Sequence, residues 1–195
     1  LRRKETFATS GPRIKVRFFA GYEFDFEMIN KQDLVKHLYE NGHTMGSEIL
    51  NTEKKGEPTF FLWALQDADS APLQRLQIIK GYIEDGELKE HVFDVLCSDG
   101  LEVNQDTSRC PDNGAIVNLN DCSFDTSTGA SELKTFWEDP TYVEGQRTFY
   151  YLRVIENPTC RWSTWDAIRN NVEPRSDYPL TIQERAWSSP IHFIP

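Results

Sequence analysis

Apolar and charged residues alternate most clearly over residues 13–20. Ile14, Val16 and Phe18 occupy every second position, and the positions between them carry cationic side chains. A strand points successive side chains to opposite faces, so this pattern predicts one apolar face and one cationic face. Gly21 follows the run and marks its end.

Helical spacing dominates residues 30–42. Leu34, Val35 and Leu38 form an apolar stripe on one side. Asn30 is a suitable N-terminal cap, and Gly42 is a suitable C-terminal stop. We therefore predict a helix here, followed by a polar loop over residues 45–58.

The rest of the chain reads as short strands separated by polar loops. The expected strands cover residues 59–65, 76–83, 89–96, 115–119, 148–155 and 184–193. Asp85-Gly86 predicts a hairpin turn between the second and third of these, and Pro190 predicts that the last is an edge strand. Short helices are expected at 130–137 and 163–170, and loops at 98–114 and 171–180.

This order of elements predicts a mostly β fold. Six or seven short strands with long loops and few helices are typical of a β-sandwich of the immunoglobulin or fibronectin kind. At 195 residues, the chain is long enough for one full hydrophobic core.

Charge and hydropathy exclude two classes of partner. The formal charge of −10 argues against nucleic acid, because an acidic surface repels phosphates. No apolar run approaches the roughly 18 residues that a membrane span needs, so we expect no membrane span.

Four cysteines, Cys97, Cys110, Cys122 and Cys160, form no C-x-x-C pair. Thiolate zinc sites usually come as close pairs, so zinc is not expected. Three of the four lie beside turn residues, which favours disulfides in an oxidising compartment. Three pairings are open, and four free thiols are the alternative.

The sequence contains none of the residue patterns that are typical of a catalytic site. The four histidines form no H-x-H or H-E-x-x-H arrangement, and the sequence contains no G-x-S-x-G or phosphate-binding glycine loop. Asp67 and Asp69 resemble the start of a calcium loop but lack its central glycine and distal glutamate. We therefore assign no catalytic, cofactor-binding or metal-binding residue, and whether the protein is an enzyme stays open.

Tryptophans are concentrated in the last third of the chain, at Trp162, Trp165 and Trp187. Flat indole rings exposed together can stack on apolar sugar faces, so these residues are candidates for a glycan-binding surface. The alternative is that they pack in the core or between layers.

Several long segments resemble the bacterial family called domain of unknown function 3604. The resemblance rests on the run from Tyr150 to Ala167, on Thr181 to Ile191, on Arg3 to Arg13 and on Leu76 to Gly81. It covers essentially the whole chain. His192, which follows Pro190-Ile191 where the family pattern favours Trp, is a local departure.

The resemblance implies a larger, exported bacterial protein, periplasmic or secreted, whose N-terminal part is similar to the polymerase-and-histidinol-phosphatase (PHP) type of metal-dependent hydrolase. Divalent metals are then expected in that part and none in this chain. Residues 1–21 would be the end of the upstream α/β barrel, 22–57 a helix-containing connector, and 58–195 the sandwich. Leu1 is not an initiator Met and Leu1 to Lys4 resembles a helix tail, which also favours a fragment.

Two functional hypotheses follow. In the first, this is a non-catalytic C-terminal region that braces or caps its own upstream catalytic domain, a phosphoesterase-like hydrolase. In the second, it is an autonomous module that binds a glycan or a protein.

Overall fold

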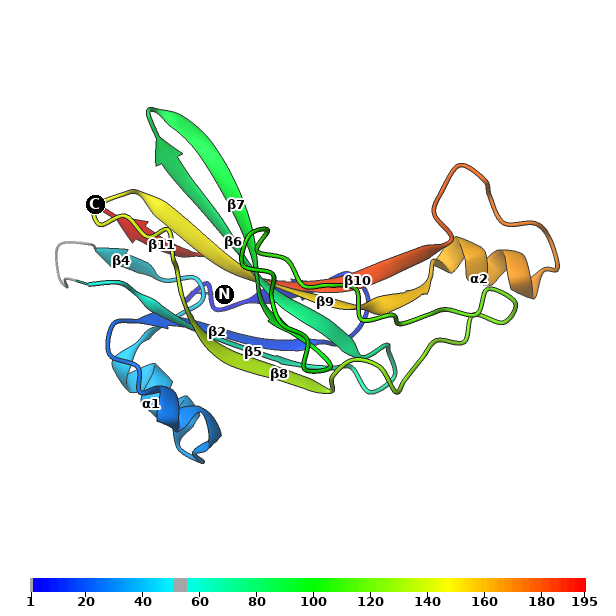
Figure 1. The fold of residues 1–195 in the computed structure, drawn as a ribbon, viewed down its shortest axis with the longest axis horizontal. Helices are drawn as coiled ribbons and strands as arrows, with labels where there is room; N and C mark the ends of the chain where they lie inside the picture. The colour runs from blue at the N-terminus through cyan, green and yellow to red at the C-terminus, as the bar shows by residue number, and fades with distance from the viewer. Residues whose placement is uncertain (1, 51–55) are drawn as a thin grey trace.

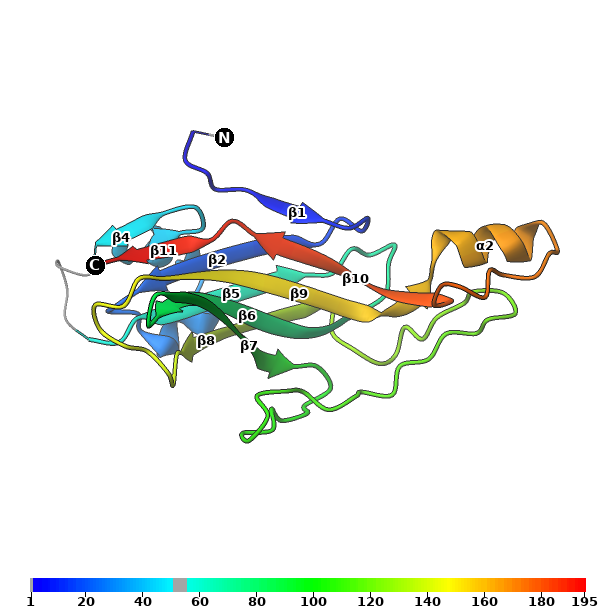
Figure 2. The ribbon, with the colours of Figure 1, turned by 90° about the horizontal axis from the view of Figure 1, so that it is seen from above.

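The computed structural model describes residues 2–50 and 56–195, and its strands form two β-sheets that face each other. The larger sheet contains β1 (Phe7–Thr9), β4 (Glu48–Leu50), β6 (Leu73–Glu84), β7 (Glu87–Cys97), β9 (Thr148–Cys160), β10 (Thr181–Ser188) and β11 (Ile191–Ile194). The smaller sheet contains β2 (Lys15–Gly21), β3 (His43–Thr44), β5 (Thr59–Leu65) and β8 (Glu132–Glu138). Figures 1 and 2 show the two layers.

Strand pairing links distant parts of the sequence. The larger sheet runs β1-β10-β9-β11-β4, with β6 also paired to β9 and β7 paired to β6. The smaller sheet runs β3-β2-β5-β8. The central strand β9 therefore contacts β6, β10 and β11, and it organises the larger sheet.

The main core lies between the two sheets. Phe18 and Phe60 from the smaller sheet meet Tyr150, Leu152 and Phe193 from the larger one, and all five are fully buried. Burial of apolar area on this scale is the principal favourable term in folding. The predicted alternation over 13–20 is confirmed, because the apolar positions face this core and the cationic ones face solvent.

A second apolar cluster covers the outer face of the smaller sheet. The 3₁₀ helix η1 (Phe26–Asn30) and α1 (Leu34–Asn41) lie against it, and Leu34 and Leu38 pack on Phe19 and Phe61 (Figure 1). The predicted helix over 30–42 is confirmed at its centre and is shorter than expected. Gly42 follows its last residue.

The predicted hairpin is confirmed and is longer than expected. Asp85 and Gly86 both have positive φ, 53° and 81°, as a tight turn between twisted strands requires. The strands expected at 59–65 and 148–155 are also confirmed, and the second continues to Cys160. The helix expected at 163–170 is α2 (Trp162–Arg169), beyond the far end of β9 (Figure 1).

The helix predicted at 130–137 is wrong, because Glu132–Glu138 form the strand β8. Leu133 and Trp137 face the main core, whereas Phe136 packs in the outer cluster beneath η1. Because both faces of this strand are covered, apolar and polar residues do not alternate along it. Leu133, Phe136 and Trp137 are instead spaced three and four residues apart, which is the spacing of an apolar helix face.

The closing segment is two strands, and neither is the predicted edge. Pro190 lies in the break between β10 and β11, where no ladder hydrogen bond is needed. β10 lies between β1 and β9, and β11 lies between β9 and β4. Residues 115–119 form no strand either, and Val117 makes only an isolated bridge to Phe124.

The predicted loop 45–58 contains β4, which pairs in parallel with β11. Residues 51–55 of that loop lie outside the described residues. β1 pairs with β10, and β2 pairs with β5 over the whole of its length. Residues 7–21 thus contribute strands to both sheets, and an origin in an upstream barrel stays a prediction for residues 1–21.

Candidate functional site

Two disulfides fasten the long loop that follows β7. Cys97, at the end of β7, pairs with Cys110, and Cys122 pairs with Cys160 at the end of β9. Among the described residues no cysteine is free. The expectation of disulfides is confirmed, and the structure selects one of the three pairings that the sequence left open.

Register places a row of polar side chains on the outer face of the larger sheet. Gln77 of β6 is paired with Asp94 of β7 on one side and with Arg153 of β9 on the other. The Gln77 amide donates to Asp94 Oδ1 at 2.5 Å, and Arg153 Nε donates to Gln77 Oε1 at 2.6 Å. Three strands are thereby cross-linked through side chains.

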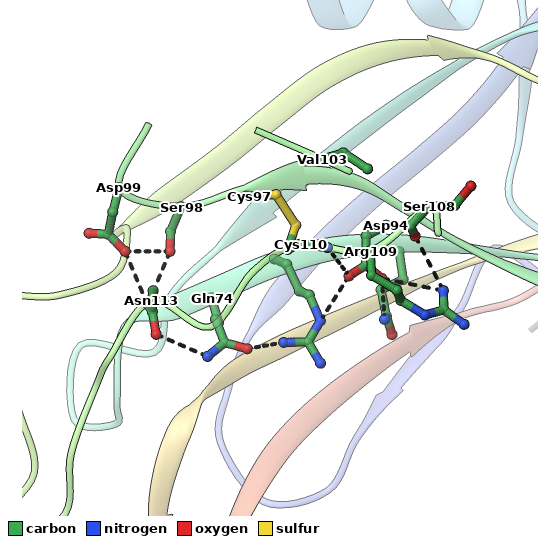
Figure 3. The surroundings of a disulfide bond; sticks show 12 residues. Gln74, Asp94, Cys97, Ser98, Asp99, Val103, Ser108, Arg109, Cys110 and Asn113 are labelled. Carbon is green, nitrogen blue, oxygen red and sulfur yellow. Dashed lines mark hydrogen bonds and ion pairs between the residues drawn. A yellow bond between two sulfur atoms is a disulfide. The ribbon is translucent and has the colours of Figure 1, made fainter. Parts of the chain in front are cut away.

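Asp94 is the centre of this row and is 4% exposed. Its Oδ2 accepts the backbone N–H of Cys110 at 2.7 Å and lies 3.5 Å from Arg75 Nε. Arg109 Nη1 lies 3.8 Å from the other oxygen. Figure 3 shows Asp94, Arg109 and the Cys97–Cys110 bridge together. The bridge and this buried carboxylate fix the loop backbone that carries Arg109.

A second polar network adjoins the first. Gln74 Nε2 donates to Asn113 Oδ1 at 3.0 Å, and the Asn113 amide donates to Asp99 Oδ2 at 3.0 Å (Figure 3). Asn113 also donates to Asn157 Oδ1 on β9 at 2.9 Å. The loop is therefore anchored by hydrogen bonds to β6 and β9 as well as by its disulfides.

Between this loop and strands β6, β9 and β10 lies a groove of about 620 Å³, which we call the arginine groove. Its charged lining residues are Arg75, Arg109, Arg161, Arg185, Asp94 and Asp112. Four guanidinium groups against two carboxylates leave an excess of positive charge in a chain whose formal charge is −10. No local sequence pattern indicates this groove, because its arginines come from four separate segments.

Glu156 of β9 is a carboxyl group with no exposed surface. Its Oε2 accepts the Ser70 hydroxyl at 2.8 Å, whereas Oε1 has no hydrogen-bond partner among the described residues. The pKa of Glu156 is raised to about 7, chiefly by burial, which the Ser70 hydrogen bond opposes; the negative charges of Asp67 and Glu184 contribute to the rise.

We expect the free energy of unfolding to fall as the pH rises from about 4.5 to about 7, because of Glu156. The unfolded carboxyl ionises near 4.5 and the folded one near 7, so the folded state holds the extra proton between these values. The loss of stability caused by ionising the buried Glu156 carboxyl is therefore absent below pH 4.5 and complete above pH 7. At ~1.4 kcal/mol per pKa unit it reaches about 3 kcal/mol.

Urea unfolding of wild type and Glu156→Gln at pH 4.5 and 7.5 measures this effect. The variant should lose less stability over that interval than the wild type does. Glu87→Gln, at an exposed hairpin position, controls for the loss of a carboxyl group. Parallel pH profiles for wild type and Glu156→Gln would contradict the assignment.

The three predicted tryptophans occupy two places. Trp162 and Trp165 lie on α2, where Trp162 is 77% exposed and Trp165 is partly buried. Trp187 lies on β10, and the strand between it and the α2 end at Thr181 spans roughly 20 Å. A glycan surface formed by these residues stays a prediction, and Trp162 offers the most exposed ring.

A second hollow lies beside the N-terminal segment. It measures about 590 Å³ and is lined by residues 3–7, the cationic face of β2, Tyr39 of α1, and Trp63 and Leu65 of β5. Glu5 fixes the segment, because it accepts the hydroxyls of Tyr39 and Thr44. Exposed apolar surface surrounds the opening, with Phe7 45%, Tyr39 44% and Leu65 37% exposed. We call this the N-terminal hollow.

Within 2–50 and 56–195, no three or more His, Cys, Asp or Glu side chains gather in a way that could hold a metal ion. No helix in this part of the chain is long and apolar enough to cross a membrane.

The fold and its bridges define a mostly β, disulfide-linked protein built on two facing sheets. The chain belongs to the family described as Protein of unknown function (DUF3604), whose model matches residues 1–195. No curated protein and no solved structure matches the chain.

Proposed function

We propose that this chain is the non-catalytic C-terminal region of a larger exported protein and that it braces the upstream catalytic domain. The N-terminal hollow is the observation that carries the proposal. Residues 3–7 form one of its walls, so a domain joined through this segment would be held next to the opening. Phe7, Tyr39 and Leu65 offer apolar area there, and Arg3, Lys15 and Arg17 offer charge.

The nature of the parent is part of the same proposal. Its catalytic domain would be PHP-like and phosphoesterase-like, with its divalent metals held by residues outside this chain. This region would be an immunoglobulin- or fibronectin-like sandwich that follows the barrel. Two disulfides support an oxidising location, periplasmic or secreted, because cytosolic thiols are kept reduced.

Substitution in the N-terminal hollow of the full-length parent tests the bracing role. Leu65→Asp should weaken the contact between the two parts, because it places a charge in an apolar interface. We expect earlier cleavage between them in limited proteolysis and a lower unfolding temperature for the catalytic domain. Leu88→Asp, at a 73% exposed position on β7, is the control. Identical proteolysis and unfolding for the two variants would rule out bracing through this hollow.

The alternative is an autonomous glycan- or protein-binding module, and the exposure of Trp162 favours its glycan form. Affinity electrophoresis of the chain in polysaccharide gels discriminates the two. Retardation that Trp162→Ala abolishes and Phe26→Ala leaves intact would favour the glycan-binding module. Phe26 is an exposed aromatic residue on η1 and serves as the matched control.

A further inference from the structure

The arginine groove gathers positive charge that its own carboxylates do not balance. Asp94 pairs with Arg75 and Arg109, and Asp112 is exposed at the rim. Within the described residues, neither Arg161 nor Arg185 lies within ion-pair distance of a carboxylate. Cations near one another without counter-charges are unfavourable unless an anion joins them.

Two of these guanidinium groups also have an unused donor. Arg75 Nε and Arg161 Nε are both inaccessible to solvent and have no hydrogen-bond partner among the described residues. Arg75 Nε retains only its 3.5 Å ion pair with Asp94. A buried N–H without an acceptor destabilises the fold, and both of these donors belong to guanidinium groups of residues that line the groove.

The electrostatic potential at Arg75, inside the groove, is also positive. Burial lowers the pKa of the Arg75 guanidinium, and the Asp94 carboxylate opposes this shift. The cations Arg153, Arg109 and Arg185 lower the pKa further. Arg75 is therefore within electrostatic range of three other positive charges, although the chain as a whole is acidic.

The arginines are held in place by the scaffold. Arg109 Nη1 donates to the carbonyl of Val92, and its loop is fastened by the Cys97–Cys110 bridge. Arg75 Nη1 donates to Gln74 Oε1, which also accepts from Gln183 at 2.9 Å. Guanidinium groups positioned in this way can donate in pairs to the oxygens of phosphate, sulfate or carboxylate.

We propose that the arginine groove binds a doubly charged oxyanion, either free phosphate or sulfate or the same group on a small organic molecule, held by Arg75, Arg161 and Arg185. Lining charges of +4 and −2 match a dianion. A volume of about 620 Å³ leaves room beyond the anion for an organic part. This inference does not depend on the bracing role, which uses a different surface.

Calorimetric titration of the chain at low ionic strength tests the proposal, with sodium phosphate, sodium sulfate and glucose 6-phosphate as separate ligands. We expect saturable binding at one site. Arg161→Gln and Arg185→Gln should each weaken it about tenfold, which corresponds to the loss of one charge-assisted hydrogen bond. Arg185 is exposed, so its substitution leaves folding intact, and circular dichroism verifies this. Arg75 is not replaced, because its loss would remove one of the counter-charges of the buried Asp94 carboxylate and could destabilise the fold.

Arg17→Gln is the matched control. It removes the same charge from an exposed strand position in the N-terminal hollow, on the other sheet. Its affinity should equal that of the wild type. Tighter binding of glucose 6-phosphate than of phosphate assigns an organic ligand, and equal affinities assign the free ion. Absence of saturable binding for all three ligands, or an equal loss in Arg17→Gln and Arg185→Gln, would overturn the proposal.

Discussion

Lys80→Met should destabilise the protein by about 3–5 kcal/mol, because it leaves a buried carboxylate without its counter-charge. Lys80 lies 2.6 Å from Asp139 Oδ2, and their side chains are 2% and 0% exposed. The ammonium group also donates to the carbonyl and hydroxyl of Thr141, at 2.7 and 3.0 Å. Tyr150 OH donates to the same Asp139 oxygen at 2.7 Å. Without Lys80 this network surrounds an uncompensated negative charge.

Urea unfolding monitored by tryptophan fluorescence measures the effect. Lys89→Met is the matched control, since Lys89 lies on the same hairpin and pairs with Glu84 at the surface. Exposed pairs contribute about 0–1 kcal/mol, so the control should stay close to wild type. Equal losses in the two variants would show that burial of the Lys80–Asp139 pair does not matter.

Removing the Cys122–Cys160 bridge as Cys122→Ser/Cys160→Ser should lower the free energy of unfolding by about 4 kcal/mol. The bridge spans 38 residues, and closing a loop of that length restricts the unfolded chain more than closing a short one. Cys97–Cys110 spans 13 residues and should contribute about 3 kcal/mol. The comparison of the two double-serine variants therefore isolates the loop length.

Chemical unfolding without reductant measures these losses. Both variants should also give faster proteolysis of the segment between Ser98 and Ser131, which the bridges attach to β7 and β9. A loss below about 1 kcal/mol for the longer bridge would mean that the hydrogen bonds of Asn113 and Asp94 hold this loop without it.

Local patterns predicted the elements whose two faces have different surroundings. The alternation of Ile14, Val16 and Phe18 identified β2, because over residues 13–18 one face meets the core and the other, with its cationic residues, is exposed. Asp85-Gly86 identified the hairpin, because a tight turn needs two residues that tolerate positive φ. The stripe Leu34–Leu38 identified α1 for the corresponding helical reason.

The same patterns failed where both faces of a strand are covered. β8 meets the main core through Leu133 and the outer cluster through Phe136, so its hydrophobic residues lose the period of two. Pro190 predicts an edge strand, whereas in the structure it separates two strands that are both interior. Strand order depends on partners far away in the sequence, and no local pattern contains it.

The burial of Lys80 could have been predicted from the sequence, although its partner could not. It shares the core face of β6 with Leu76 and Ile78, so period-two counting alone would have placed a lysine in the interior. Its partner could not have been found, because Asp139 lies 59 residues away, directly after β8. The arginine groove had no comparable signal, since its arginines lie on β6, β10, the long loop and the start of α2.

By itself, the sequence determined the mostly β character, the hairpin and the centres of α1 and α2, and it favoured disulfides over free thiols, because each follows from neighbouring residues or from residue type. Only the tertiary structure decided the pairing of the cysteines, the partner of Lys80 and the gathering of arginines beside Asp94. Those features depend on strand register across two sheets. Register is set by packing between segments that can be more than a hundred residues apart, as Gln74 and Gln183 are.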